Sequence, residues 1–422
     1  MKCPVYSRVL VLAYAIVLTG TPLLHGENAT LFDASDPVAG MGINIHFTDA
    51  QPGELEMLSK AGFRWVRMDL FWSSTEKTAD IYDFSGYDRL LDSLDKFHIR
   101  ALLILDYGNS LYDGGLSPHT EEGRAAFTKW AVAAVTHFKD RGVLWEIWNE
   151  PNGSWFWKPK ADVADYAKLA LAVNHGIRQA APNEQIVGPA LSGTDLAFID
   201  VLGRDGVFAD WSALTIHPYL RTAPETYGPV YDRAHDLIKK YAPSGHDMKV
   251  ICGESGYCCT WKGLDETLQA QYLARLLLFN TLSGVPLTIW YDWRDDGDDP
   301  TNTEDHFGIV HHDFRAENAD PFEPKPSYTA ASIYSSQLTD YRFAKRIKTS
   351  SPNDFILSFT QGAKECLVAW TTSPNPHPVL IHAPDGIYIA TNFDGTKHTE
   401  VASTGGVLVL TLDGGPQYLK RE

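Results

Sequence analysis

The chain has 422 residues and a formal net charge of -17 at pH 7. Such an excess of negative charge argues against nucleic acid as a partner and against binding to anionic membrane surfaces. The length exceeds one ordinary domain, but an α/β barrel with a small appendage accounts for it, and hydrophobic residues at 44% suffice for a core.

The N-terminus has the pattern of a secretory signal peptide. Lys2 and Arg8 precede an apolar run over 9–18, which is too short to cross a bilayer. We expect a signal peptide over 1–28, with cleavage between Gly26 and Ala29. No later segment is long and apolar enough for a membrane helix, so we expect no membrane span and a protein that is secreted or periplasmic.

Short apolar runs then alternate with stretches of helical spacing, such as 87–98, 120–140, 162–180, 229–242 and 264–283. The runs that we interpret as strands are 40–47, 65–70, 100–106, 144–149, 185–188, 213–217, 249–254 and 287–291. Strands alternating with helices in this number predict a closed parallel (β/α)8 TIM barrel over 40–338. A doubly wound sheet is the alternative, but no Gly-x-Gly-x-x-Gly follows the first strand.

After a last helix near 327–337 the pattern changes. From 339 to 422 the apolar runs "FILSF", "CLVAW", "PVLIHA", "GIYIA" and "GVLVLTL" are separated by turn residues, without helical spacing. This pattern predicts a small C-terminal antiparallel β-sandwich, to be counted as an accessory domain. The segment 29–39, between the signal peptide and the first barrel strand, is a candidate to join that sandwich.

Barrel chemistry occurs at the carboxyl ends of the strands, so the residues there are site candidates. Two of them, Glu150 and Glu254, directly follow the apolar runs of the fourth and seventh strands. Paired carboxylic groups across a barrel mouth are what glycosidic hydrolysis requires: one protonates the leaving oxygen and the other attacks the sugar carbon. The other strand-end candidates are Asn44, His46, Arg67, Asp69, Asp106, Asn149, His217, Tyr219, Trp290, Tyr291 and Asp292.

Two other barrel chemistries fit less well. A Schiff-base aldolase needs a lysine at a strand end, and none of the predicted ends carries one. A phosphate-binding isomerase needs a non-acidic turn after the last strands, whereas the eighth is followed by Asp292, Asp295, Asp296, Asp298 and Asp299. The 12 Trp and 19 Tyr suit a ligand with one apolar face, such as a sugar.

The motifs "WNEP" on the fourth strand, "HPY" on the sixth and "GESG" on the seventh resemble those of the clan A glycoside hydrolases. Over 40–337 the segments "WVRMDLFWSSTE", "WEIWNEPNGSWFWKPKADVADYAKL", "DHFGIV" and "PKPSY" are most similar to glycoside hydrolase family 39 and its exopolysaccharide-degrading relatives. The resemblance implies a retaining β-glycosidase acting on a β-linked oligo- or polysaccharide.

The resemblance also implies roles for individual residues. Glu150 matches the acid/base and Glu254 the nucleophile. The residues expected to bind substrate or to line its pocket are Asn44, His46, Arg67, Asp69, Trp72, Trp148, Asn149, Trp155, His217, Tyr219, Trp290 and Tyr291. The "YCC" after the nucleophile and the acidic loop "DWRDDGDDP" depart from the family pattern and leave the sugar open. The non-enzymatic alternative is a carbohydrate-binding barrel without turnover.

Physical reasoning assigns the two glutamates opposite states. Trp148 and Trp155 flank Glu150 in sequence, and we expect these indoles to desolvate its carboxyl, which raises a pKa and keeps the acid protonated. A positive Arg67 near Glu254 would instead favour the ionised form needed for attack.

The remaining signals concern cysteines, metals and glycosylation. Export permits a disulfide, and Cys252 with Cys258 or Cys259 is the nearest pairing in sequence, Cys366 being the other mature cysteine. We expect no cofactor and no metal, with the acidic loop over 295–305 a surface loop and not a calcium site. We expect a monomer, and no glycan on the sequon at Asn152, because a glycan would crowd the cleft.

Overall fold

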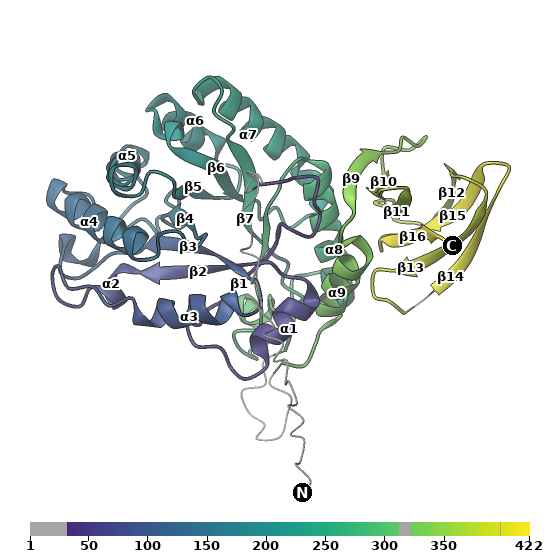
Figure 1. The fold of residues 1–422 in the computed structure, drawn as a ribbon, viewed down its shortest axis with the longest axis horizontal. Helices are drawn as coiled ribbons and strands as arrows, with labels where there is room; N and C mark the ends of the chain where they lie inside the picture. The colour runs from purple at the N-terminus through teal and green to yellow at the C-terminus, as the bar shows by residue number, and fades with distance from the viewer. Residues whose placement is uncertain (1–31, 312–321, 397) are drawn as a thin grey trace, which may run out of the picture. The chain divides into compact units, whose positions relative to one another are not determined.

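The computed structural model of the protein describes residues 32–311, 322–396 and 398–422 (Figure 1). A ring of parallel strands closes where the first pairs with the last. In chain order the barrel strands are β1 (Met41–Asn44), β2 (Trp65–Phe71), β3 (Arg100–Asp106), β4 (Leu144–Ile147), β5 (Gln185–Ser192), β6 (Trp211–His217), β7 (Lys249–Ser255) and β8 (Thr288–Trp290). The predicted (β/α)8 barrel is therefore confirmed.

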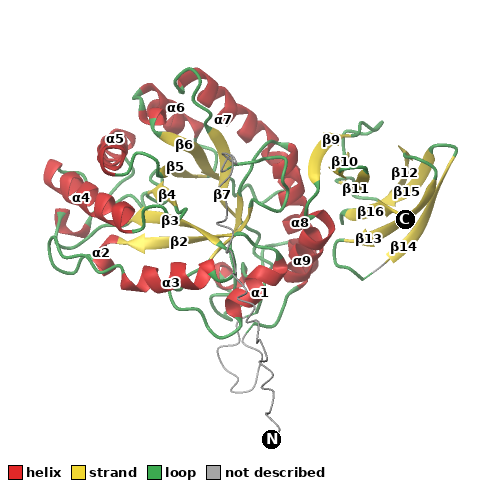
Figure 2. Cartoon of the chain, viewed as in Figure 1, coloured by secondary structure: helices red, strands yellow, loops and turns green. Residues whose placement is uncertain are grey.

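Helices lie outside the barrel strands, as Figure 2 shows in red around yellow. They are α1 (Glu54–Ala61), α2 (Trp72–Thr75), α3 (Ser85–Asp95), α4 (Glu121–His137), α5 (Val163–Ala180), α6 (Leu196–Arg204), α7 (Gly228–Tyr241), α8 (Glu266–Leu282) and α9 (Pro326–Leu338). Short 3-10 turns are η1 (Asp113–Gly115), η2 (Val207–Ala209), η3 (Pro224–Tyr227) and η4 (Thr303–His306).

Side-chain caps explain where several long helices begin. Thr120, Asp162 and Asp265 each accept a hydrogen bond from a backbone N–H in the first turn of α4, α5 and α8. The helices α1, α2 and α6 have no clear helical period in the sequence, because each is short and has few turns.

The C-terminal region forms one continuous antiparallel sheet in the order β12-β15-β14-β13-β16-β11-β10-β9. Its strands are β9 (Arg342–Arg346), β10 (Asp354–Gln361), β11 (Lys364–Thr371), β12 (His377–His382), β13 (Gly386–Asn392), β14 (His398–Thr404), β15 (Val407–Leu412) and β16 (Gln417–Arg421). The sheet curls around a core that includes Ile356, Leu367 and Leu408. Our sequence analysis missed β9, β14 and β16, whose residues are mostly polar.

A hydrogen bond from the sheet to a buried ion pair of the barrel joins the two parts. Arg275 on α8 makes two hydrogen bonds to Glu225 on η3, of 2.8 and 2.6 Å. The indole of Trp370 on β11 donates to the same carboxylate at 2.7 Å. Because Arg275 and Glu225 are both nearly buried, this contact has little solvent screening.

The predicted signal peptide and its cleavage site lie outside the described residues. Of the segment 29–39, the described part contacts β9: Phe343 donates its backbone N–H to Ser35 at 2.7 Å, and Arg342 pairs with Asp36 at 3.0 Å. No strand is assigned between 32 and 40. Within the described part of the chain, no helix is long and apolar enough to cross a membrane.

Candidate active site

A cleft of about 450 Å³ lies at the carboxyl ends of the barrel strands. Both candidate glutamates line it, together with seven of the predicted binding residues: Asn44, His46, Arg67, Asp69, Asn149, Tyr219 and Tyr291. The sequence analysis did not single out several other lining residues, namely Tyr107, Phe156, Ser192, Arg221, Trp261, Glu304 and Phe307. Most of these lie on loops, where a sequence pattern gives no orientation.

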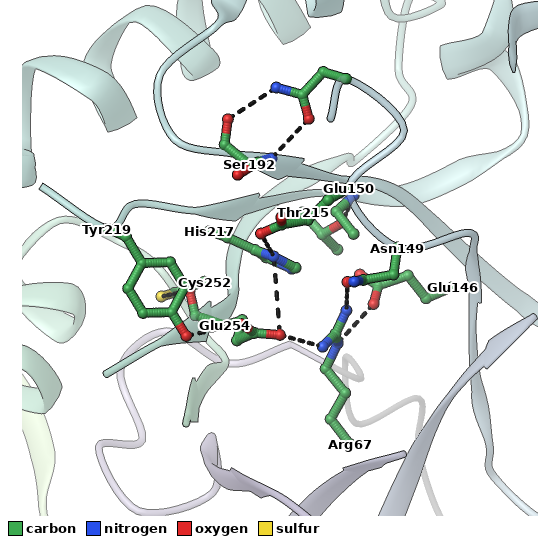
Figure 3. Close-up of polar contacts among 12 residues, drawn as sticks. Arg67, Glu146, Asn149, Glu150, Ser192, Thr215, His217, Tyr219, Cys252 and Glu254 are labelled. Atoms are coloured by element: carbon green, nitrogen blue, oxygen red, sulfur yellow. Dashed lines mark hydrogen bonds and ion pairs between the residues drawn. The ribbon is translucent and has the colours of Figure 1, made fainter. Parts of the chain in front are cut away.

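Arg67 is the charged centre of the site (Figure 3). Its guanidinium is almost fully buried and donates three hydrogen bonds: from Nε to Glu146 at 2.7 Å, from Nη1 to Glu254 at 2.6 Å, and from Nη2 to Asn149 at 2.8 Å. A planar guanidinium holds its partners at fixed angles, so Arg67 positions β4 and β7 relative to each other. Glu146, which the sequence analysis missed, supplies a buried countercharge.

Glu254 at the end of β7 accepts a hydrogen bond on each carboxylate oxygen. Arg67 donates to Oε2, and the hydroxyl of Tyr219 donates to Oε1 at 2.8 Å. Two donors on separate oxygens orient the carboxylate in the cleft. The predicted proximity of Arg67 and Tyr219 to Glu254 is thus what the structure shows.

Glu150 occupies a different environment, although it lies in the same cleft. Its Oε1 is 2.9 Å from Nδ1 of His217, which is completely buried. Burial raises the pKa of Glu150 to about 7, against the opposing effects of a hydrogen bond with Ser192 and the charge of Arg67. Burial lowers the pKa of His217 to about 4, so its ring is neutral at pH 7.

The two glutamates lie close together across the cleft. One oxygen of Glu150, one oxygen of Glu254 and a ring nitrogen of His217 are all within 4.8 Å of one another. Retaining glycosidases hold their two carboxyl groups about 5–5.5 Å apart, whereas inverting ones leave about 6.5–9.5 Å for a water molecule. The approach of one oxygen from each group is compatible with the shorter separation.

The structure corrects the predicted role of the tryptophans. Trp72, Trp148 and Trp290 are buried and do not line the cleft, so they offer no free ring face to a ligand. Trp148 packs against Trp157, with ring centroids 5.0 Å apart. Trp155 points into solvent at 87% exposure, and stacking of a sugar on it stays a prediction.

Desolvation by burial is the largest cause of the raised pKa of Glu150, and the carboxyl lies against the buried ring of His217. His217 was expected to contact substrate, but it does not line the cleft. It contacts the carboxyl of Glu150 instead. The predicted direction of the pKa shift and its cause, desolvation, are confirmed, whereas the part played by the flanking indoles stays a prediction.

Asn152, the sequon residue, is tied to β5. Its amide donates to the backbone carbonyl of Ser192 at 2.9 Å and accepts from the Ser192 N–H at 3.0 Å. This pair of bonds holds Ser192 beside Glu150. A glycan on the Asn152 nitrogen would have to replace one donor of this arrangement, which supports the expectation that Asn152 carries none.

The disulfide that export would permit is not formed, because Cys252, Cys258, Cys259 and Cys366 are all free thiols in the structure. Cys252 is buried on β7, with its Sγ 3.7 Å from the carbonyl of Glu254. Cys258 instead lies 3.0 Å from the hydroxyl of Thr260. Nearness in sequence did not bring the sulfur atoms together.

His46, on the loop after β1, is a second positive group in the cleft. Although burial acts in the opposite direction, a hydrogen bond with Asp292 and its charge raise the pKa of His46 to about 9. His46, Asp292 and Asp296 each offer one potential metal-ligand atom within 4.8 Å of the others. The predicted absence of a metal stays a prediction.

Comparisons with known proteins agree with this geometry. A family model described as cellulase (glycosyl hydrolase family 5) matches residues 34–296. The structure of a family 39 glycoside hydrolase from Bacteroides cellulosilyticus WH2 is 26% identical, with a TM-score of 0.80, and the match covers 92% of this chain and 82% of that one. A monomeric β-xylosidase from Caulobacter crescentus CB15 has a TM-score of 0.68 at 17% identity over 91% and 96% of the two chains, a likeness of fold.

A curated relative, a β-xylosidase of Geobacillus stearothermophilus, is 32% identical over 127 residues. The match spans 26% of this chain and 25% of that relative, so the chain covers about a quarter of the relative's length. The family model, by contrast, covers more than half of the chain. The protein therefore belongs to the cellulase family (glycosyl hydrolase family 5), within the clan A glycoside hydrolases that the sequence motifs predicted.

Proposed function

We propose that the protein is a secreted β-glycosidase that retains the anomeric configuration and acts on a β-linked oligo- or polysaccharide by double displacement. The observation that carries this proposal is that one oxygen of Glu150 and one oxygen of Glu254 lie within 4.8 Å of each other, in opposite electrostatic surroundings. Glu150 has a pKa near 7 and keeps a proton to give away. Glu254 is held by Arg67 and Tyr219 and is the group ready to attack.

In the first step a carboxylate oxygen of Glu254 attacks the anomeric carbon, and Glu150 donates its proton to the departing glycosidic oxygen. The product is a glycosyl ester on Glu254 and a free alcohol. In the second step the ionised Glu150 takes a proton from water, which attacks the same carbon and releases Glu254. A pKa near 7 suits a group that must give a proton and then take one.

Asn149 fits the role of a substrate-orienting residue. Its Oδ1 accepts from Arg67 at 2.8 Å, and its Nδ2 donates to the hydroxyl of Tyr107 at 2.9 Å. These bonds fix which way the amide points and leave one N–H for a sugar hydroxyl, the 2-hydroxyl that the family resemblance implies.

β-Xylosides are the first substrates to test, because two of the relatives described above are named β-xylosidases. Aromatic rings of Phe156, Trp261 and Phe307 line the cleft and suit the apolar faces of pyranose rings. The panel should include xylans, β-glucans, mannans and acidic exopolysaccharides. Binding of these glycans without release of reducing sugar would favour the alternative, a carbohydrate-binding barrel.

A mechanism-based label tests the assignment of the nucleophile. A 2-fluoro glycoside with an activated leaving group should add one sugar to the wild type, and peptide mass analysis should place it on Glu254. Glu254→Gln should take up no label and lose turnover, because an amide cannot form the ester. A sugar found on any other residue would overturn the assignment. Sequencing of the mature N-terminus from culture medium or periplasm tests the proposed export.

A further inference from the structure

Two aspartates at the ends of neighbouring strands lie apart from the catalytic pair. Asp69 lies on β2 and lines the cleft, two residues after Arg67. Asp106 ends β3 and is completely buried. The two strands are parallel, with Asp69 level with Ile104, so the two carboxyl groups come from adjacent strands at the same end of the barrel.

The carboxyl of Asp106 has an unusual set of neighbours. Neither of its oxygens meets an N–H or O–H donor among the residues that the structure describes. The neighbouring carboxyl on the adjacent strand is that of Asp69, which raises the pKa of Asp106 through its negative charge and a side-chain hydrogen bond. Two ionised carboxylates have no hydrogen to share, so this contact requires one proton between them.

Burial decides which aspartate keeps that proton. Asp69 reaches the cleft, whereas Asp106 has no access to water. Burial raises the pKa of Asp106 well above its ordinary range, and the negative charge of Asp69 adds to the effect. The result is a neutral acid that donates to a charged carboxylate.

The surrounding charged and titratable groups come from several elements. Arg67 on β2 opposes the shift, and Glu146 on β4 adds to it. Tyr87 on α3 and Tyr107 after β3 also face Asp106, but burial raises the pKa of both phenols, so they stay neutral. Arg67 already donates hydrogen bonds to Glu146 and Glu254, and it donates none to Asp106.

We propose that Asp69 and Asp106 form an acid–carboxylate pair in which Asp106 holds the proton and Asp69 binds a hydroxyl group of the sugar ring that contacts Glu254. Asp69 is then a specificity-determining residue and Asp106 a positioning residue that acts through it. This inference rests on the proposed glycosidase function. A carboxylate at this position accepts hydrogen bonds from a neutral sugar and repels a uronic acid.

The kinetic test compares two replacements of Asp106. Asp106→Asn keeps a donor of nearly the same shape, so its kcat and KM on a β-xyloside at pH 6 should stay within about threefold of the wild type. Asp106→Leu removes the donor, and its KM should rise roughly 10-fold or more with a smaller change in kcat, as should that of Asp69→Asn. If Asp106→Asn loses as much as Asp106→Leu, the charge of Asp106 is required and the proposal is wrong.

A stability test needs no turnover. The pKa of Asp106 is raised in the folded protein, so wild-type stability is fully present below pH about 4 and is lost as the pH rises toward the folded value. Above pH about 4, and until the pH reaches the raised pKa of Asp106, the wild-type Tm should fall relative to that of Asp106→Asn by roughly 1 to 2 °C per pH unit.

The two tests separate the possible failures. A Tm difference that does not change with pH would show an ionised Asp106 and overturn the pair. Absence of hydrolysis of every glycoside, with the Tm slope present, would instead reject the proposed function and leave the proton-sharing pair intact.

Discussion

The pKa of Glu150 predicts the alkaline limit of activity. The proposed acid is protonated below pH about 7, so kcat/KM should fall about tenfold for each pH unit above that value. The difference between 7 and the ordinary 4.5 corresponds to a net cost of about 3 kcal/mol for the ionised form, with burial as its largest cause. Changing the surroundings of Glu150 should therefore move the limit in a direction that the structure specifies.

Two variants should shift the alkaline limit of kcat/KM in opposite directions. His217→Ala removes a buried ring 2.9 Å from the carboxyl and admits water, so the pKa of Glu150 should fall toward its ordinary value. Ser192→Ala removes a hydrogen bond that lowers the pKa of Glu150. A single bond of about 1 kcal/mol should raise the limit by roughly 0.5 to 1 pH unit.

The assay is kcat/KM from pH 4 to pH 10 on a substrate with a poor leaving group, because only such a substrate needs the acid in full. The profile of kcat/KM reports the free enzyme, to which these pKa values belong. The same pH profile measured on an activated aryl glycoside serves as the control. Its kcat/KM should fall far less at alkaline pH, because this substrate needs little help from an acid. The reasoning would be refuted if the alkaline limits of both variants shifted in the same direction, or if the wild-type kcat/KM already fell near pH 5.

Three further predictions concern other parts of the molecule. Glu150→Ala should slow poor leaving groups far more than activated aryl glycosides, and azide should rescue the latter as a β-glycosyl azide; equal losses without rescue would move the acid role elsewhere. Glu225→Ala should lower the free energy of unfolding by about 3–5 kcal/mol in denaturant titrations, because it leaves Arg275 buried without its countercharge. A loss below about 1 kcal/mol would mean that water reaches Arg275. Thiol titration of the native protein should modify Cys259, the half-buried member, well before Cys252, and a disulfide in peptide maps would contradict the free thiols.

The two candidate glutamates could be located from sequence because one physical rule covers them. Glu150 and Glu254 directly follow apolar runs, and parallel strands bring their carboxyl ends to one mouth. The same rule found Arg67 and Tyr219, which are at or just after strand ends and contact Glu254. The position of a residue at a strand end was enough to predict these contacts, because the barrel brings the carboxyl ends of all its strands to the same mouth.

The aromatic residues could not be assigned in this way. Whether Trp148 faces the cleft depends on how it packs against Trp157, which lies on the following loop, and Trp155 turns to solvent on that same loop. The role of His217 was also hidden, because its strand-end position does not show that it lies behind Glu150. The unusual state of Asp106 follows from complete burial, a property of the assembled core.

The stereochemistry of the reaction tests the central claim most directly. One oxygen of Glu150 and one oxygen of Glu254 lie within 4.8 Å of each other, a short approach that favours the proposed double displacement through Glu254. Proton NMR during the first minutes of hydrolysis of a β-glycoside should show the β-anomer appearing before mutarotation. An α-anomer as the first product would contradict the double displacement and the role of Glu254.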